Sequence, residues 1–223
     1  MKLRRYLGGG RLEQDGEWHC EYDADGNLTE RYLGTGRWLD GKKDRWRYRW
    51  NADGSLAKVV RPDKREVEFT YDALGRRLSK SFGTTVTRWI WNGNVPLHQW
   101  KQHREYSVVE DRWNTDTERR DMTVWLFDEE SFVPVAMIKE GRSYSILTDQ
   151  LGTPTEAYDT EGNEVWSRVL DMDGNVIEET GNKEMVPFLF QGQYYDRETG
   201  LAYNRFRYYS PKMGMYVSQD PIG

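Results

Sequence analysis

Histidine and cysteine, two side-chain types that commonly bind metals, are few and scattered in this chain of 223 residues. Its histidines are His19, His98 and His103, and its single cysteine is Cys20. They lack the ligand spacing of a zinc site, and one cysteine cannot form an internal disulfide. The Asp-rich turn at 171–175 lacks the spaced acidic ligands and the distal Glu of a calcium loop. We therefore expect no metal and no cofactor.

Catalytic and phosphate-binding motifs are also missing from the sequence. It contains no P-loop, no GxSxG nucleophile elbow and no HExxH pair. The glycines at 8–10 are not followed by a helical pattern, so they indicate a flexible turn. These observations favour a structural or interaction protein over an enzyme.

The net charge of −5 argues against a nucleic acid as the main partner, because binding driven by counterion release needs a basic surface. The densest basic cluster lies at 42–50. From Arg45 onward cations and rings alternate with a period of two, which is typical of a half-buried strand with a charged outer face. A polyanion-binding strip is the less favoured interpretation of this segment.

The sequence has no apolar run of about 18 residues, so no membrane span is predicted. The opening MKLRRYLGGG is not followed by the apolar stretch of a cleaved secretory signal. The compartment is left open by the sequence: the cytoplasm before export, or the cell exterior after a dedicated secretion system.

One turn pattern recurs along the chain. It is an aromatic residue, an Asp or Asn, a short polar turn with a Gly, and then a Leu or Val. The pattern occurs as YDADGNL, WNADGSL, YDALGRRL, YDTEGNEV and LDMDGNV. The ring ends one strand on the buried face, the Asp or Asn bonds the turn, the Gly takes a positive φ, and the aliphatic residue starts the next strand. Its structural positions include Tyr22, Asp23, Gly26, Leu28, Trp50, Gly54, Leu56, Tyr71, Asp72 and Gly75.

The repeats predict an all-β fold in which hairpins form a curved, spirally wound antiparallel sheet. Aromatic residues make up 14% of the chain, while the mean hydropathy is only −0.92. We therefore expect cross-strand aromatic pairs to hold the sheet together, with no large aliphatic core. Open sheet edges predict self-association.

The chain is predicted to divide into hairpins at 1–102, a charged loop or insertion at 103–121, and a final region at 122–223 that continues the same sheet. The end of this last region reads PFLFQGQYYDRETGLAYNRFRYYSPKMGMYVSQDPIG. Its two aromatic-rich segments, separated by DRETG, predict another hairpin. The positions singled out here are Gly192, Tyr195, Asp196, Gly200, Tyr203, Arg207, Tyr208, Tyr209, Pro211, Asp220 and Pro221, with Asp149, Gly152 and Pro154 upstream.

Together, the YDxxGxL units, TDQLGTPTEAYDTEGNEVW, FQGQYYDRETGLAYNRFRYYSPKMG and the terminal DPIG resemble the bacterial Rhs/YD-repeat family. The likeness is to its Rhs repeat-associated core region and covers essentially the whole chain. It implies a hollow β-shell, secreted in interbacterial competition, that encloses a toxic C-terminal polypeptide and is closed at one end by the core region. The implied partners are that toxin domain or other parts of a longer Rhs polypeptide.

The same resemblance implies that Arg207 and Asp220 assist aspartyl autoproteolysis, in which paired carboxylates act as acid and base. The second Asp-Pro motif of the family is not in this sequence, so at most half of that site is expected. Gln150 replaces the family's His, and Met215 stands where the family tends to have Arg. These departures favour a structural role in which Arg207 and Asp220 pin the end of the sheet.

Three functions therefore remain. The first is a wall segment of a toxin-enclosing shell, without the toxin itself. The second is a half-site of an autoprotease that needs a downstream Asp-Pro segment. The third is an extracellular adhesive or carbohydrate-binding module that uses exposed Trp and Tyr faces.

Overall fold

The computed structural model describes residues 3–34 and 43–219. This part of the chain is almost entirely antiparallel β-structure, and its single helical element is a 3-10 turn at Gly8–Gly10. The predicted all-β class is confirmed.

The main sheet, which we call the wall, has 17 strands. They are β1 (Arg4–Tyr6), β2 (Leu12–Asp15), β3 (Trp18–Tyr22), β4 (Leu28–Leu33), β5 (Lys43–Trp50), β6 (Leu56–Val60), β7 (Glu66–Tyr71), β8 (Arg77–Phe82), β9 (Thr85–Asn92), β10 (Val95–Ser107), β11 (Arg112–Thr115), β12 (Arg120–Phe127), β13 (Pro134–Lys139), β14 (Arg142–Thr148), β15 (Pro154–Tyr158), β16 (Glu164–Leu170) and β17 (Val176–Gly181). Each strand pairs antiparallel with the next strand in the sequence, with one exception. Strand β12 pairs with β10 instead of β11, and β11 pairs only with the outer part of β10.

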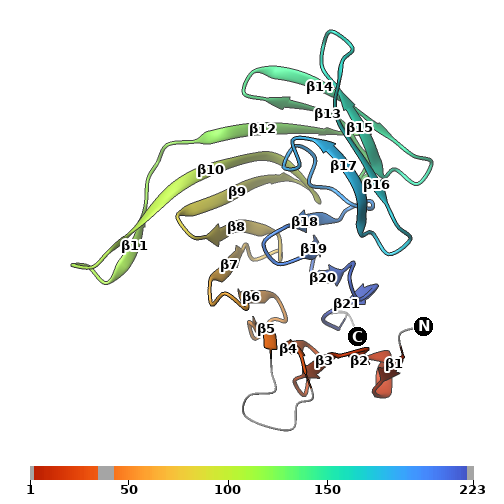
Figure 1. Ribbon diagram of the computed structural model, residues 1–223. Helices are drawn as coiled ribbons and strands as arrows, with labels where there is room; N and C mark the ends of the chain where they lie inside the picture. The colour runs from red at the N-terminus through yellow and green to blue at the C-terminus, as the bar shows by residue number, and fades with distance from the viewer. Residues whose placement is uncertain (1–2, 35–42, 220–223) are drawn as a thin grey trace.

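The wall curves, and Figure 1 shows a second, smaller sheet lying inside the curve. Its strands are β18 (Tyr194–Asp196), β19 (Leu201–Asn204), β20 (Arg207–Ser210) and β21 (Met215–Tyr216). We call residues 187–217 the C-terminal block. The core of the molecule lies between the wall and this block, since buried side chains from both form one cluster.

The repeated turns have the geometry that their sequence predicts. In the first, the Asp23 carboxylate accepts the N–H of Asn27 at 2.8 Å, and Gly26 has a φ of 81°. The turn at Asp72 has the same pattern, with its carboxylate 2.9 Å from the N–H of Arg76. The side chain fixes the turn while the glycine supplies the left-handed residue.

Successive repeats are joined by their leading rings. Each ring donates a hydrogen bond to the carbonyl of a residue that starts an earlier strand. The pairs are Tyr22 to Leu12 at 2.9 Å, Trp50 to Leu28 at 2.8 Å, Tyr71 to Leu56 at 2.8 Å and Trp91 to Arg77 at 2.7 Å. The polar edge of each ring thus ties one hairpin to the one before it.

The expected aromatic pairs across neighbouring strands are confirmed only in part: they occur in the hairpin arm and in the C-terminal block, but they do not form a ladder along the wall. Many ring pairs join the wall to the C-terminal block instead, such as Trp89 with Tyr194 and Trp125 with Phe188. The reason is that the rings lie on the inner face, which the block covers. The expectation of no large aliphatic core is also wrong, because the Leu residues that start β2, β4 and β6 are buried together with Val59 and Val67.

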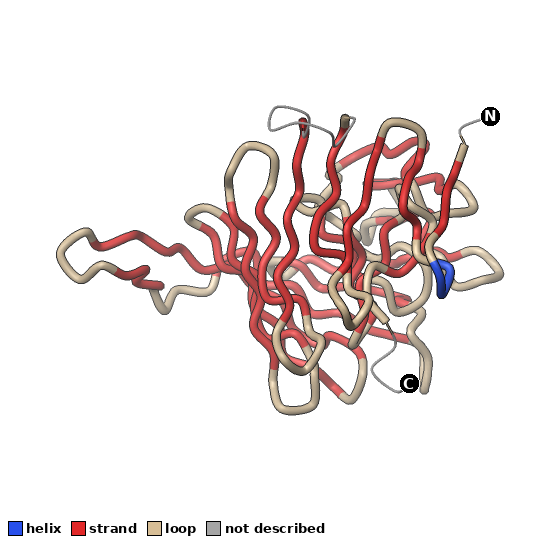
Figure 2. Tube along the Cα trace, turned by 90° about the horizontal axis from the view of Figure 1, so that it is seen from below, coloured by secondary structure: helices blue, strands red, loops and turns tan. Residues whose placement is uncertain are grey.

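The segment at 103–121 is not a loop. The outer part of β10 and the short β11 form a hairpin arm that projects from the wall (Figure 2). Tyr106 and Trp113 make a ring contact across it at 5.5 Å, which stabilises an extended hairpin despite the charged sequence. Its interpretation as an insertion, and the domain limits at 102 and 122, stay predictions.

The basic strand β5 alternates as its sequence predicts. Tyr48 is buried, and Trp46 and Trp50 pack against the core. Arg47 and Arg49 are exposed on the opposite face. Lys42, at the start of the basic cluster, lies outside the described residues.

Candidate functional site

The C-terminal block is built on a tight hairpin. The carbonyl of Asp196 accepts the N–H groups of Thr199 at 3.1 Å and Gly200 at 2.8 Å. Gly200 has a φ of 69°, which explains the glycine of DRETG. Tyr195 lies in β18 and Tyr203 in β19, as the hairpin pattern predicts.

A buried ion pair attaches the block to the wall. The Asp196 side chain has no exposed surface and accepts hydrogen bonds from the Arg77 guanidinium and from Lys80 Nζ, the latter at 3.0 Å. Lys80 also contacts the Glu198 carboxylate at 2.8 Å. Because a buried charge is costly unless it is paired, two cations from β8 fix the position of the hairpin.

Arg77 is surrounded by aromatic rings from both sheets. Its guanidinium carbon lies 4.4 Å from the ring centre of Trp89 and 4.7 Å from that of Tyr203, with Phe69 and Tyr194 slightly farther away. Burial lowers the pKa of Arg77, but the charge of Asp196, the hydrogen bond to it, and the nearby Tyr208 and Tyr194 together outweigh burial, and the net shift is upward. The side chain therefore stays a cation in an aromatic setting.

Sequence reasoning missed Arg77. The turn pattern in YDALGRRL predicts Leu78 as the residue that restarts the strand, but the structure places Arg77 at that inward position, while Leu78 is 39% exposed. A signal was present, since Arg77 is the sixth residue after the leading Tyr71, the place occupied by Leu28 and Leu56 in the earlier repeats. A cation in an aliphatic register position indicates a buried partner.

Tyrosine hydroxyls add a second set of attachments. The hydroxyls of Tyr71 and Tyr208 lie 2.8 Å apart. Tyr203 donates its hydroxyl hydrogen to the carbonyl of Gly75 at 2.9 Å and accepts the N–H of Arg77 at 3.1 Å. Burial raises the pKa of Tyr203 to about 12. These rings stay neutral and bridge the wall turn to the block.

Several wall turns touch the block at their glycines. A methyl group added at Gly75 would lie 2.7 Å from the Phe206 ring, and one at Gly174 would lie 3.1 Å from the Phe190 ring. A methyl group added at Gly26 would lie 2.6 Å from the side chain of Gln219, which follows the block in the sequence. By contrast, Gly54 has open space. In some turns the glycine therefore has two roles: it supplies the positive φ of the turn, and its lack of a side chain lets the C-terminal segment approach closely.

The wall turn that contains Asp149 and Gly152 contacts the block in the same way. The carboxylate of Asp149 accepts the N–H of Thr153 at 2.9 Å, and a methyl group at Gly152 would lie 2.6 Å from the Gln191 side chain. Pro154 begins β15 and is buried.

The remaining predicted positions lie within the block. Tyr209 donates its hydroxyl hydrogen to the Asp173 carbonyl at 3.0 Å. The carbonyl of Pro211 accepts the Asn175 amide at 3.1 Å. A methyl group at Gly192 would lie 3.3 Å from the Asn204 side chain.

Arg207 begins β20, and its guanidinium carbon lies 3.8 Å from the ring centre of Tyr216. Asp220 and Pro221 lie outside the described residues, so the pairing of Arg207 with Asp220 is not tested. The autoproteolysis half-site stays a prediction.

The rest of the described chain holds no group of three or more His, Cys, Asp or Glu residues arranged to hold a metal ion. A search of the same residues finds no helix with the length and apolar character needed to span a membrane.

Comparison with known proteins places this geometry in context. The sequence model of the family described as Teneurin YD-shell matches residues 5–222. The chain is 28% identical to the probable deoxyribonuclease RhsB of Dickeya dadantii, over 96% of this chain and 14% of that protein. It is 32% identical to the toxin protein Tse5 of Pseudomonas aeruginosa, over 96% of this chain and 18% of that protein.

Among solved structures, the crystal structure of TcdB2-TccC3-TEV superposes with a TM-score of 0.59 at 16% identity, covering 92% of this chain and 12% of that one. At this identity the likeness shows the fold alone. The chain thus spans less than a fifth of the length of each of these relatives.

Proposed function

Because this chain belongs to the YD-shell family of the Rhs and YD-repeat proteins, we propose that it encloses a C-terminal polymorphic toxin as one wall segment of a longer polypeptide's shell. The family and the fold support a structural role. The nuclease and toxin activities in the relatives' names belong to those proteins, and the segment shared with them is the wall.

One observation carries this proposal. The wall buries its rings on one curved face, and that face receives the C-terminal block through the ion pair of Arg77 with Asp196. The carbonyl of Val217 accepts the N–H of Leu28 at 2.8 Å, so a polypeptide that continues past the block would start beside the wall turn that contains Gly26. The block would then close one end of the shell while the wall surrounds the downstream segment.

The proposal is tested by photo-crosslinking in the longer polypeptide that carries this segment. Benzoylphenylalanine is placed at Tyr144, which packs toward the core on β14, or at Leu147, which is 50% exposed on the opposite face of that strand. We expect the inner position to crosslink to the segment downstream of Gly223 and the outer one not to. Equal crosslinking from both faces, or none from Tyr144, would reject enclosure.

Neither of the other two functions is tested by the described residues. The chain-cleaving module depends on Asp220 and stays a prediction. Its test is to mix the chain with a peptide that extends past Gly223 and to look for cutting that depends on Asp220. A sugar-binding surface needs exposed rings, whereas Trp89, Trp125 and Trp166 are all at most 2% exposed. Trp113 on the hairpin arm is 44% exposed.

A further inference from the structure

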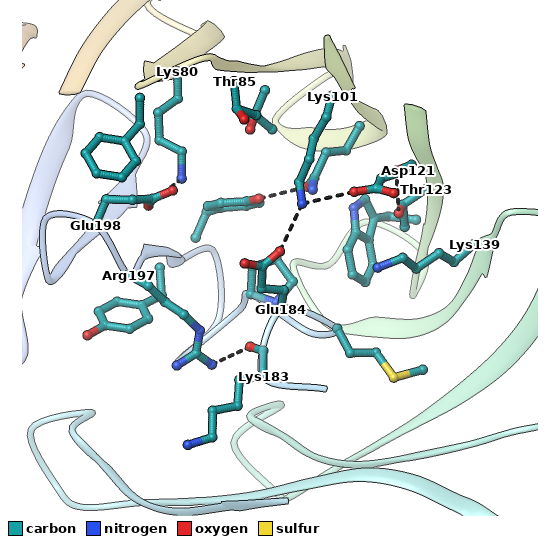
Figure 3. Close-up of a pocket in the computed structure, with 18 residues that line it drawn as sticks. Lys80, Thr85, Lys101, Asp121, Thr123, Lys139, Lys183, Glu184, Arg197 and Glu198 are labelled. Atoms are coloured by element: carbon teal, nitrogen blue, oxygen red, sulfur yellow. Dashed lines mark hydrogen bonds and ion pairs between the residues drawn. The ribbon is translucent and has the colours of Figure 1, made fainter. Parts of the chain in front are cut away.

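A pocket of about 320 Å³ lies beside the C-terminal block (Figure 3). One side is the inner face of the wall from β8 to β13, and the other is the segment at 183–187 with the end of β18. The block therefore leaves this part of the inner face open.

The floor of the pocket is a row of alternating lysines and threonines. Lys80 on β8 lies opposite Thr87 on β9, and Thr87 lies opposite Lys101 on β10. Farther along the wall, Thr123 on β12 lies opposite Lys139 on β13. Elsewhere this face carries mainly buried rings and aliphatic side chains, and its buried cations Arg77 and Arg168 bond directly to the C-terminal segment, so an inward polar row beside an open pocket needs an explanation.

Two of these lysines are neutralised within the protein. Lys101 Nζ lies 3.0 Å from the Asp121 carboxylate and 2.9 Å from that of Glu184. Burial lowers the pKa of Lys101, but hydrogen bonds to Glu184 and Asp121 give it a net upward shift, so it stays charged. Lys80 is paired with Asp196 and Glu198.

The pocket nevertheless keeps an excess of positive charge. Its charged lining consists of the cations Lys80, Lys101, Lys139, Lys183 and Arg197 and the carboxylates Asp121, Glu184 and Glu198. Arg197 is paired with Glu179, which lies outside this lining. Within the described part of the chain, neither Lys139 nor Lys183 forms an ion pair, although Lys139 is close enough to Asp121 and Glu184 to help lower the pKa of both carboxyl groups. Figure 3 shows Lys139 and Lys183 on different sides of the pocket. The pocket is thus locally positive, although the net charge of the whole chain is −5.

We propose that the pocket binds an acidic stretch of the polypeptide that the wall encloses, with Lys139 and Lys183 as partners for its carboxylates. This inference rests on the proposed function. The size is at the lower end of ligand sites and admits a short run of extended chain, not a folded domain. In such a recess an ion pair is screened less than on the open surface.

The test measures the anisotropy of a labelled peptide, Gly-Glu-Asp-Glu-Gly, titrated with this chain at low salt. A peptide with Gln and Asn in place of the acids serves as the neutral probe. We expect the acidic peptide to bind and the neutral one not to. Binding should weaken as salt is raised, because the contact is electrostatic.

Variants then locate the binding. Lys139→Gln is expected to weaken binding by about fivefold to tenfold, as loss of one close charge pair does, and Lys139→Gln with Lys183→Gln should abolish it. The matched control is Lys43→Gln, an exposed lysine at the start of β5 that does not line the pocket, and this variant should leave binding unchanged. Circular dichroism confirms that each variant is folded.

Four results would overturn the proposal: no binding of the acidic peptide, equal binding of the neutral one, equal losses in the Lys139 and Lys43 variants, or full displacement by equimolar inorganic phosphate. The last would show a site for small anions. A failure of peptide binding would not change the crosslinking expected from Tyr144. The two results therefore distinguish a failure of this proposal from a failure of the proposed enclosing function.

Discussion

At the scale of single residues, Asp196 has the largest predicted effect on stability. Its side chain is fully buried between Arg77 and Lys80. Replacing it with Asn leaves the buried Arg77 without its counter-charge and leaves Lys80 with Glu198 alone, and breaking a buried pair in this way typically costs about 3–5 kcal/mol. We expect Asp196→Asn to lower the free energy of unfolding by that order, measured by urea denaturation.

The matched control is Asp63→Asn. Asp63 also pairs with two arginines, Arg61 and Arg65, but on the surface. Exposed pairs contribute little, so this variant should unfold close to the wild type. If both variants lose the same stability, the buried pair does not hold the block in place.

Cys20 gives a prediction about pH. The residue is 6% exposed, and burial raises the pKa of its thiol to about 11. The thiolate is the reactive form, so at pH 8 alkylation by iodoacetamide should be about 100-fold slower than for a free cysteine with its usual pKa. The rate should rise with pH up to about 11.

Mass spectrometry of the labelled protein measures this rate. The same protein in denaturing urea is the control and should react at the rate of a free thiol. Rapid labelling of the native protein at pH 8 would contradict the buried position of Cys20.

At the scale of elements, the wall turns differ in what surrounds their glycines. Gly75 and Gly54 both have positive φ, so substitution of either by Ala should lower the stability of the protein by about 1 kcal/mol. Only Gly75 faces the Phe206 ring, 2.7 Å from an added methyl group. Gly75→Ala should therefore lose about 1–2 kcal/mol more than Gly54→Ala, since overpacking forces side chains to shift.

Thermal melts of the two variants make this comparison, and removing the ring provides its control. Adding Phe206→Ala to Gly75→Ala should bring the effect of the glycine substitution down to that at Gly54. An unchanged difference would mean that the contact between turn and block contributes nothing.

At the scale of the whole molecule, the wall has two open edges. Among the described residues, β1 pairs only with β2 and β17 only with β16. Unpaired edge strands invite another chain. We therefore expect the isolated chain to self-associate with rising concentration, measured by light scattering.

A charge on the edge tests the mechanism. Ile177 on β17 is 67% exposed, and Ile177→Lys should reduce association. Met172→Lys, in a turn where the methionine is 92% exposed, is the control that adds the same charge away from the edge. A monomer at high concentration in the unmodified chain would contradict this prediction.

The sequence by itself determined the local structure of this protein, that is, its turns and the strands that flank them. The spacing of ring, Asp, Gly and aliphatic residue in YDADGNL was enough to predict a turn and two antiparallel strands, because these choices depend on nearby backbone. The alternation from Arg45 to Trp50 likewise predicted which face of β5 is buried. Local rules also misled, since the charged segment at 103–121 indicated a loop or an insertion, whereas the outer part of β10 and the short β11 pair there as a hairpin arm.

Only the tertiary structure decided what the inner face holds. Arg77 and Asp196 are 119 positions apart, and their pairing depends on the curvature accumulated over many strands, which no single repeat encodes. The same curvature brings Phe206 onto Gly75 and gathers Lys101, Lys139 and Lys183 around one pocket. Side chains meet there because the sheet bends, and the bend is a property of the assembled wall.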